Sequence, residues 1–185
     1  MQTQTVPESV RRAVTGDVCA FEELYEAHRT RMFRYFYQHT SDQADSEELT
    51  QSFFVKLWRA LPQFEDRGVP FVAWLYRMAR NHLVDHYRSM RRRAAFSEPL
   101  ETADGRRDER ATIDLQRCED SLVLTHALEA LRPKQREIVV LRFYAQLNTT
   151  EIATVMGMTE GAVRVQQTRA LQAMRRELDR EGVTR

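Results

Sequence analysis

One group of side chains near the C-terminus has the chemistry needed to read the edges of DNA bases. Five of its members share one side of the helix expected after Gly157: Arg164, Val165, Thr168, Arg169 and Gln172. Arginine can bond bidentately to guanine and glutamine to adenine, while valine and threonine methyl groups can contact a thymine methyl. A major-groove reading helix needs this combination. Taken alone, the group could also be the solvated face of an ordinary helical hairpin.

The residues before this group predict how it is positioned. Asn148 and Glu151 have the spacing of a capping pair that opens a short helix. Gly157 then ends that helix, and Thr159 can cap the next one. Because the capped helix and the tight turn precede the polar side, residues 148–176 are interpreted as a helix-turn-helix that reads duplex DNA.

A second polar side belongs to the helix expected to begin at Phe71. At helical spacing it carries Trp74, Arg77, Asn81, Asp85, Arg88 and Arg92. An aromatic ring can stack on an unpaired base and arginines can hold phosphates, which suits single-stranded or melting DNA. Asp85 can act by orienting Arg88, three residues further on. The alternative places Trp74 in a core and the other residues on a solvated face.

A third polar group has the opposite charge. It consists of Asp45, Glu47, Glu48, Gln51, Ser52 and Lys56. Its acidic character makes it a poor DNA surface, so it could instead bind a protein. Acidic residues early in a helix also favour its macrodipole, which leaves helix stabilisation as the alternative role.

These groups require helices to present them, and the sequence predicts an all-α chain. Apolar residues recur at intervals of three and four residues almost throughout, and only 6 Gly and 5 Pro are present. Three helices are expected in the first domain. The first begins near Asp17, the second spans about 45–61, and the third runs from Phe71 into Arg93. Further helices are expected within 122–178.

The chain is predicted to form two small helical domains, residues 1–93 and 121–185, joined by a flexible linker, residues 94–120. In the linker the apolar periodicity fades and charges of both signs crowd together. A short helix near Ile113 to Cys118 is one option within it.

Composition excludes several classes of protein. The Lys and Arg residues number 28 and the Asp and Glu residues 27, so the net charge of +1 is low for a protein that clamps DNA alone. Either the basic residues are concentrated locally or another protein supplies much of the affinity for DNA. Cys19 and Cys118 lack metal-ligand spacing, and no phosphate loop or nucleophile and base set is present, which predicts no metal, cofactor, small-molecule substrate or enzymatic activity. With no membrane-spanning run and no signal peptide, a cytoplasmic location is expected.

The ordered combination of these segments resembles bacterial sigma factors of the extracytoplasmic-function (ECF) group. Residues 45–58 resemble the segment that docks on the clamp helices of RNA polymerase, and residues 71–88 resemble the promoter-melting and minus-ten segment. Residues 131–137, 151–153 and 156–164 are similar to the minus-thirty-five reading domain. The match extends from Asp17 to Leu178 apart from the linker.

The resemblance implies a non-enzymatic factor that binds core RNA polymerase at its clamp helices and flap, directs it to promoters and promotes DNA melting. It implies control by an anti-sigma factor, which could hold the chain at the membrane without inserting it. The resemblance assigns minus-thirty-five recognition to the five residues from Arg164 to Gln172 described above. It assigns minus-ten recognition and melting to the six residues from Trp74 to Arg92, together with Asp66 and Arg67 in the loop before them. It assigns polymerase binding to Asp45, Glu48, Leu49, Gln51, Lys56 and Trp58.

Two features depart from this family pattern. Gln146 occupies a turn position where glycine is usual, and Val165-Gln166-Gln167 replaces a more typical Ser-Arg pairing, which leaves the minus-thirty-five sequence open. A conventional helix-turn-helix regulator with a sensing or dimerising N-terminal domain is the competing hypothesis. The polar side from Trp74 to Arg92 argues against it, because a sensor domain has no need of one.

Overall fold

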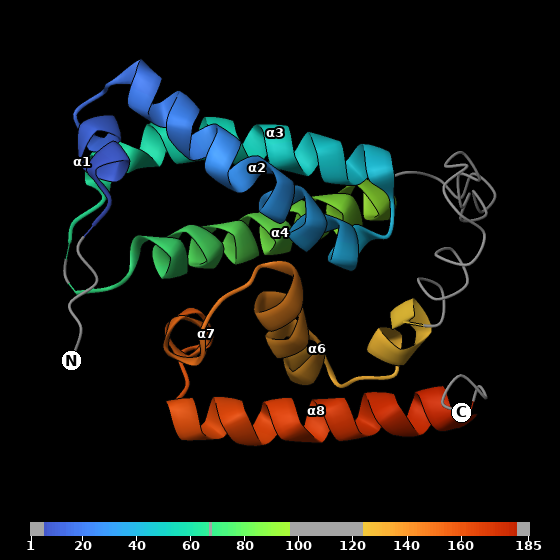
Figure 1. The fold of residues 1–185 in the computed structure, drawn as a ribbon. Helices are drawn as coiled ribbons and strands as arrows, with labels where there is room; N and C mark the ends of the chain where they lie inside the picture. Colours follow the sequence, from blue (N-terminus) through green and yellow to red (C-terminus); the bar gives the residue numbers. More distant parts are fainter. Residues whose placement is uncertain (1–5, 67, 97–123, 181–185) are drawn as a thin grey trace. The chain divides into compact units, whose positions relative to one another are not determined.

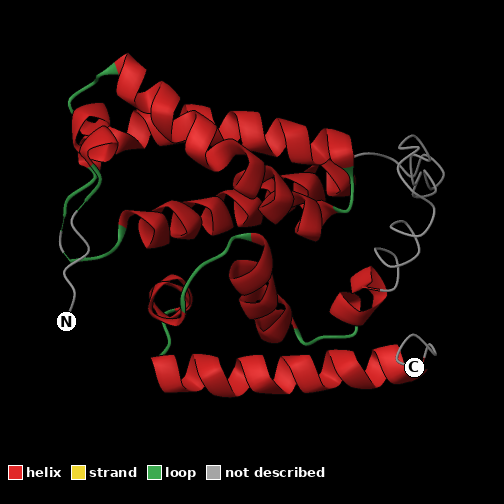
Figure 2. Ribbon diagram, in the orientation of Figure 1, coloured by secondary structure: helices red, strands yellow, loops and turns green. Residues whose placement is uncertain are grey.

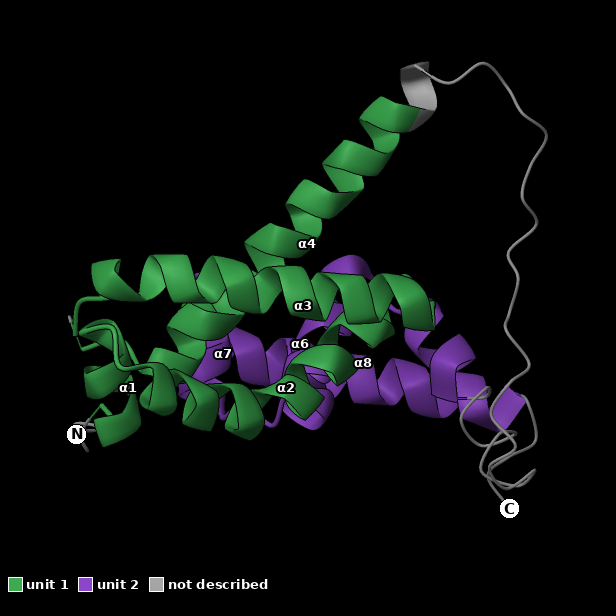
Figure 3. Cartoon of the chain, turned by 90° about the horizontal axis from the view of Figure 1, so that it is seen from above, with its two compact units in different colours: residues 1–107, 154–156 green, residues 108–153, 157–185 purple. Residues whose placement is uncertain are grey.

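The structure is a computed structural model that describes residues 6–66, 68–96 and 124–180. Its regular elements are helices, and no strand occurs among these residues (Figures 1 and 2). The described helices fall into two compact units, one with α1 to α4 and the other with α6, η2, α8 and most of α7 (Figure 3). The predicted all-α class with two helical domains is confirmed. The option of a helix near Ile113 to Cys118 lies outside the described residues.

Two of the long helices of the first unit begin close to their predicted positions, where aspartates cap them. α2 spans Val18–Thr40, and the Asp17 side chain accepts a hydrogen bond from the Ala20 amide at 3.1 Å. α3 spans Gln43–Ala60 and begins before the predicted Asp45, because Asp42 caps it. A short 3₁₀ helix, η1 (Leu61–Gln63), follows, and α4 spans Phe71–Phe96, ending inside the predicted linker.

The prediction of three helices in this unit was wrong, because α1 (Glu8–Val14) precedes them. Its N-cap is Pro7, which supplies no side-chain cap, and seven residues are too few to show a clear period. Tertiary packing stabilises it instead, with Val10 and Ala13 buried. The Arg12 Nε donates to Asp17 Oδ2 at 2.8 Å, which joins α1 to the cap of α2.

Aromatic side chains fill the core between α2, α3 and α4. The Tyr35 ring of α2 meets Tyr76 of α4 edge to face, with 5.5 Å between centroids, and Phe36 meets Phe53 of α3 at 5.8 Å. All four side chains are buried. Edge-to-face aromatic pairs contribute beyond the area that they bury, so these contacts fix how the three helices cross.

The second unit contains a helical stretch at 124–129, α6 (Pro133–Val139), η2 (Val140–Tyr144), most of α7 (Thr149–Met156) and α8 (Glu160–Arg180). Pro133 opens α6 at its first turn, where its fixed φ suits the helix and its missing N–H is not needed. A core of small and aliphatic side chains joins the first stretch to α6 and α8: Ala127, Leu128, Leu131, Val139, Ala170 and Met174.

The end of α6 widens into the π-helix η2, where the Ala145 amide donates to the Val140 carbonyl oxygen at 3.1 Å. Gln146 then adopts a left-handed conformation, with φ of 60°. The turn position where glycine is usual in the family therefore does require positive φ in this chain. A side chain with a Cβ atom is strained there.

We expect Gln146→Gly to raise the free energy of unfolding of the second unit by about 0.5 to 1 kcal/mol, because glycine adopts positive φ without strain but gains entropy in the unfolded chain. Urea unfolding of the full chain measures this change. Gln146→Ala is the control, since it keeps the Cβ atom and should give no gain. A glycine variant no more stable than the alanine variant would contradict the strain.

Two histidines of the first unit titrate in unfavourable surroundings. The His28 ring lies against Phe71, with 6.2 Å between centroids, and its Nδ1 has no hydrogen-bond partner among the described residues. Burial lowers the pKa of His28, and the charge of Arg31 acts in the same direction. Burial also lowers the pKa of His82, where Lys56 adds to the effect.

We therefore expect the free energy of unfolding to fall as the pH is lowered from about 7 to about 5. A histidine with a lower pKa in the folded chain binds fewer protons there than when unfolded. Its contribution is thus complete above the unfolded value of about 6.5 and is lost as the pH falls toward the folded value. The non-titrating variant His28→Gln should make this dependence shallower in urea unfolding at several pH values. An equally steep dependence would exclude His28 as a cause.

Candidate nucleic-acid interface

The five residues expected to read duplex DNA lie together on α8. All are exposed, and they line one shallow hollow on its surface: Arg164, Val165, Thr168, Arg169 and Gln172. Val165 is 49% exposed, which leaves an apolar side chain available for a partner. The Thr168 hydroxyl donates to the Arg164 carbonyl oxygen at 3.0 Å, so its methyl group remains for apolar contact. Buried residues on the other side of α8 hold this surface outward.

Local hydrogen bonds build the helix-turn-helix that presents α8. The Glu151 amide donates to Asn148 Oδ1 at 2.9 Å, and the Asn148 amide donates to Glu151 Oε2 at 2.8 Å, which completes the predicted capping box. Gly157 ends α7 with φ of 63°, and the Ala162 amide donates to Thr159 Oγ1 at 3.3 Å. The predicted helix, turn and helix are therefore confirmed.

Three polar contacts beside this surface were not predicted. The Glu160 carboxylate binds Arg164 within α8 and Thr150 of α7, at 3.2 and 2.8 Å. Gln135 Nε2 of α6 donates to Gln166 Oε1 at 3.4 Å, so this unusual glutamine bonds to α6. The spacing of Glu160 and Arg164 could have indicated their pairing, but the other two contacts join separate helices.

The second polar side is presented along α4. Five of its predicted members are exposed: Arg77, Asn81, Asp85, Arg88 and Arg92. Trp74 is only half-buried, and its ring lies 5.1 Å from Phe64 and 5.8 Å from Phe71, measured between centroids. Trp74 therefore belongs to an aromatic cluster but is not enclosed by it. Its position is intermediate between a core residue and a ring exposed for stacking on a base.

The loop before α4 is attached to it by this aromatic cluster. Phe64 is buried, and its ring meets Phe71 perpendicularly at 5.4 Å between centroids. Asp66 is exposed, and its Oδ1 accepts a hydrogen bond from the Gly68 amide at 3.3 Å. Arg67, the other predicted loop residue, lies outside the described residues.

Polar contacts join α3 to this side of α4. Ser52 Oγ lies 3.0 Å from His82 Nε2, and Lys56 Nζ lies 3.4 Å from Asp85 Oδ2. Asp85 Oδ1 is also 3.9 Å from Arg88 Nη1, consistent with the predicted orienting role. Lys56 therefore pairs with the predicted DNA-contacting helix, although it was assigned to polymerase binding.

The other predicted polymerase-binding residues of α3 differ in exposure. Glu48 and Gln51 are exposed, and Asp45 is half-buried. Leu49, in contrast, is buried at 2% exposure, so the structure corrects its assignment from a surface contact to a core residue. The half-buried Trp58 packs edge to face on Phe21, with 4.9 Å between centroids.

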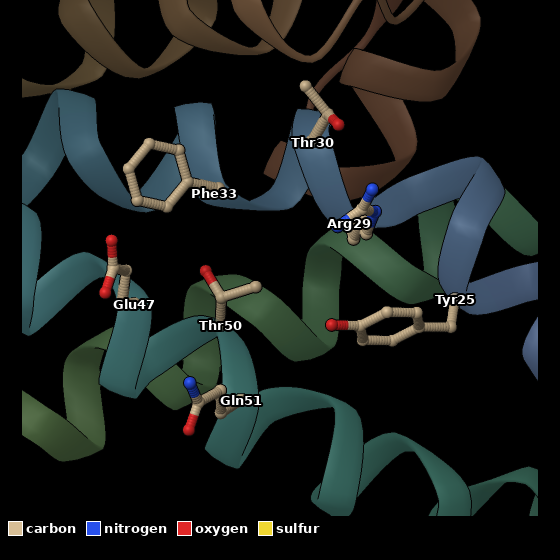
Figure 4. A pocket seen from close by; sticks show the side chains of 7 residues that line it. All are labelled: Tyr25, Arg29, Thr30, Phe33, Glu47, Thr50 and Gln51. Carbon is tan, nitrogen blue, oxygen red and sulfur yellow. The ribbon is translucent and has the colours of Figure 1, made fainter.

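A pocket between α2 and α3 adjoins the exposed acidic residues (Figure 4). It is ≈ 280 Å³ in volume. Its lining comes from both helices: Tyr25, Arg29, Thr30, Phe33, Glu47, Thr50 and Gln51. Tyr25 and Phe33 are half-buried, so part of each ring is accessible from the pocket.

Other kinds of site find no support in the described part of the chain. Residues 6–66, 68–96 and 124–180 contain no group of three or more His, Cys, Asp or Glu that could hold a metal ion. Within the same ranges, none of the helices combines the length and apolar character needed to cross a membrane.

Comparisons with known proteins match both units. The family model described as Sigma-70 region 2 matches residues 24–93, and that described as Sigma-70, region 4 matches residues 127–176. The chain is similar to ECF RNA polymerase sigma factor BldN of Streptomyces coelicolor, at 36% identity over 172 residues, covering 92% of this chain and 65% of BldN. Its similarity to ECF RNA polymerase sigma factor SigD of Mycobacterium tuberculosis is 35% over 188 residues, covering 98% of this chain and 88% of SigD.

A solved structure is also similar. CnrH, determined in complex with the cytosolic domain of CnrY, matches with a TM-score of 0.70 and 26% identity. The match covers 92% of this chain and 95% of CnrH.

Proposed function

The chain belongs to the ECF sigma factors of bacterial RNA polymerase, and we propose that it directs the core enzyme to specific promoters and promotes DNA melting there. It performs no catalysis itself. The observation that carries this proposal is the pair of exposed polar sides, on α4 and on α8, within the segments that match sigma regions 2 and 4.

In this proposal α8 reads the minus-thirty-five element. The recognition helix of a helix-turn-helix enters the major groove, where arginine and glutamine can bond to base edges. Support comes from the shallow hollow that Arg164, Val165, Thr168, Arg169 and Gln172 line together. The exposed Val165 suits a thymine methyl group.

The surface of α4 binds the minus-ten element and stabilises its melted strand. Asn81 and the exposed arginines Arg77, Arg88 and Arg92 can bond to bases and phosphates. Trp74 keeps part of its ring accessible for stacking, and Asp66 is exposed in the loop before α4. From the sequence, Arg67 is assigned to the same role. Lys56 contributes by pairing with Asp85, which partly neutralises a carboxylate that would repel phosphate.

The exposed side of α3 binds core polymerase. Glu48 and Gln51 are exposed on this side, and the pocket beside them adds Tyr25, Arg29 and Phe33 of α2. Asp45 and Trp58 border this side, and Leu49 supports it from the core. Binding through polymerase also accounts for the net charge of +1, because the core enzyme supplies much of the non-specific grip on DNA.

Regulation by an anti-sigma factor is part of the proposal. CnrH, to which the chain is similar over most of its length, was solved with the cytosolic domain of another protein bound. A partner of this kind would act where this chain works, which is the cytoplasm, and could hold it at a membrane without inserting it.

The proposal is tested by adding the full chain to bacterial core RNA polymerase and a genomic promoter library. We expect new transcript starts that depend on the chain and share two upstream elements. Correctly folded chain that yields no such starts would overturn the proposal. Tight sequence-specific binding of duplex DNA without polymerase would instead favour a conventional helix-turn-helix regulator.

Glu48→Lys tests the polymerase surface. Reversing this exposed charge should lower affinity for core polymerase at least tenfold, because a like charge then faces the basic surface expected on the partner. Asp179→Lys, an exposed reversal on α8, is the charge-matched control. Co-purification of core enzyme measures the effect, and wild-type affinity in a folded Glu48→Lys variant would remove this residue from the interface.

Arg169 tests the minus-thirty-five surface. Arg169→Ala should weaken promoter binding by about 1 to 3 kcal/mol if the guanidinium bonds bidentately to a base. Arg169→Lys keeps the charge but loses the two-pronged geometry, so it should lose the same base discrimination while keeping the salt dependence. Equal promoter preference in both variants and the wild type would refute the assignment.

A further inference from the structure

Glu160 joins the two helices of the helix-turn-helix to one of the predicted base-reading arginines. It is the first residue of α8. Its Oε1 accepts a hydrogen bond from Thr150 Oγ1 of α7 at 2.8 Å, and its Oε2 accepts one from Arg164 Nη2 at 3.2 Å. The carboxylate thus has one oxygen bonded to each helix.

This carboxylate occupies a position that is unfavourable for an unpaired acid. The N-terminal residues of a recognition helix enter the major groove, where a negative charge meets the field of the phosphates. The Arg164 side chain is 70% exposed and that of Glu160 is 44% exposed. Exposed pairs of this kind contribute little to folding, whereas the helix macrodipole favours an acid in the first turn of α8 whether or not it is paired. Neither effect accounts for the pairing with Arg164.

We propose that Glu160 is a positioning residue that makes Arg164 selective for a base edge over the DNA backbone. The inference rests on the proposed function, because it requires α8 to read the minus-thirty-five element. Pairing with Glu160 orients the guanidinium along the helix and partly neutralises its charge, which weakens its attraction to a single phosphate. The two acceptor atoms of a guanine edge match the paired donors of arginine, so guanine competes for the guanidinium better than a single phosphate does.

Thr150 determines where this carboxylate is held. Its hydroxyl comes from α7, so the orientation of Glu160 depends on the packing of α7 beside α8 and not only on the rotamer of one surface side chain. Arg164 is in turn oriented by a carboxylate that is fixed at its other oxygen. The element that discriminates therefore includes three side chains from two helices.

The experiment uses the full chain bound to core polymerase as holoenzyme. Affinity is measured for a promoter and for its single-base substitutions across the minus-thirty-five element, at several salt concentrations. Arg164→Ala first identifies the base pair that Arg164 reads. Glu160→Gln and Thr150→Val are the test variants. Glu177→Gln is the matched control, since Glu177 also accepts from an arginine of α8, Arg180, at 3.2 Å.

For Glu160→Gln we expect about a tenfold loss of discrimination at the Arg164 base pair. Affinity for unrelated DNA should rise, and the slope of log affinity against log salt should steepen by about one, because the freed arginine engages a phosphate. Thr150→Val leaves the charge in place, so it should reduce discrimination with no change in slope. Glu177→Gln should match the wild type in both measurements.

Three results would overturn the inference. If the wild type discriminates at the Arg164 base pair and both Glu160→Gln and Thr150→Val discriminate equally well, the contacts of Glu160 have no role in base selection. Loss at a different base pair with an unchanged salt slope would make Glu160 a direct base contact, as to a cytosine amino group. Wild-type holoenzyme with no dependence on the minus-thirty-five sequence would overturn the proposed function together with this inference.

Discussion

Burial of one apolar side on each long helix is the constraint on which both candidate DNA surfaces depend. In α4 the buried residues Leu75, Tyr76 and Ala79 face α2 and α3, and the Tyr76 ring meets Tyr35 edge to face. In α8 the buried residues Val163 and Ala170 have the same role within the second unit. Because a helix repeats every 3.6 residues, fixing its apolar side also fixes which polar side chains point outward.

Charge is distributed according to these surfaces. The net charge of the chain is +1, yet α4 and α8 each present several exposed arginines, while α3 exposes the acidic Glu47 and Glu48. On the candidate DNA surfaces of α4 and α8, Lys56 and Arg88 accompany Asp85, and Arg164 accompanies Glu160. Such exposed pairs contribute little to folding, and the role that we propose for the Glu160 pair is to orient Arg164 and limit its attraction to phosphate.

The turns around α7 balance stabilising and straining features within a few residues. The reciprocal capping box of Asn148 and Glu151 satisfies amides that would otherwise lack partners at the start of α7. Two residues before Asn148, Gln146 holds positive φ although its side chain disfavours that conformation. The packing of the surrounding helices therefore requires this turn strongly enough to impose it on an unfavourable residue.

The sequence by itself determined the all-helical class, the capped starts of α2 and α7, the glycine turn, and the members of the polar sides on α4 and α8. Each depends on interactions within about four residues, which local spacing encodes. Only the tertiary structure decided that α1 forms, that Leu49 is core while Glu48 is surface, and that Tyr25 and Phe33 line a pocket. It also decided the contacts from Lys56 to Asp85 and from Thr150 to Glu160. These depend on the angle and register at which separate helices pack, which the spacing within a single helix does not specify.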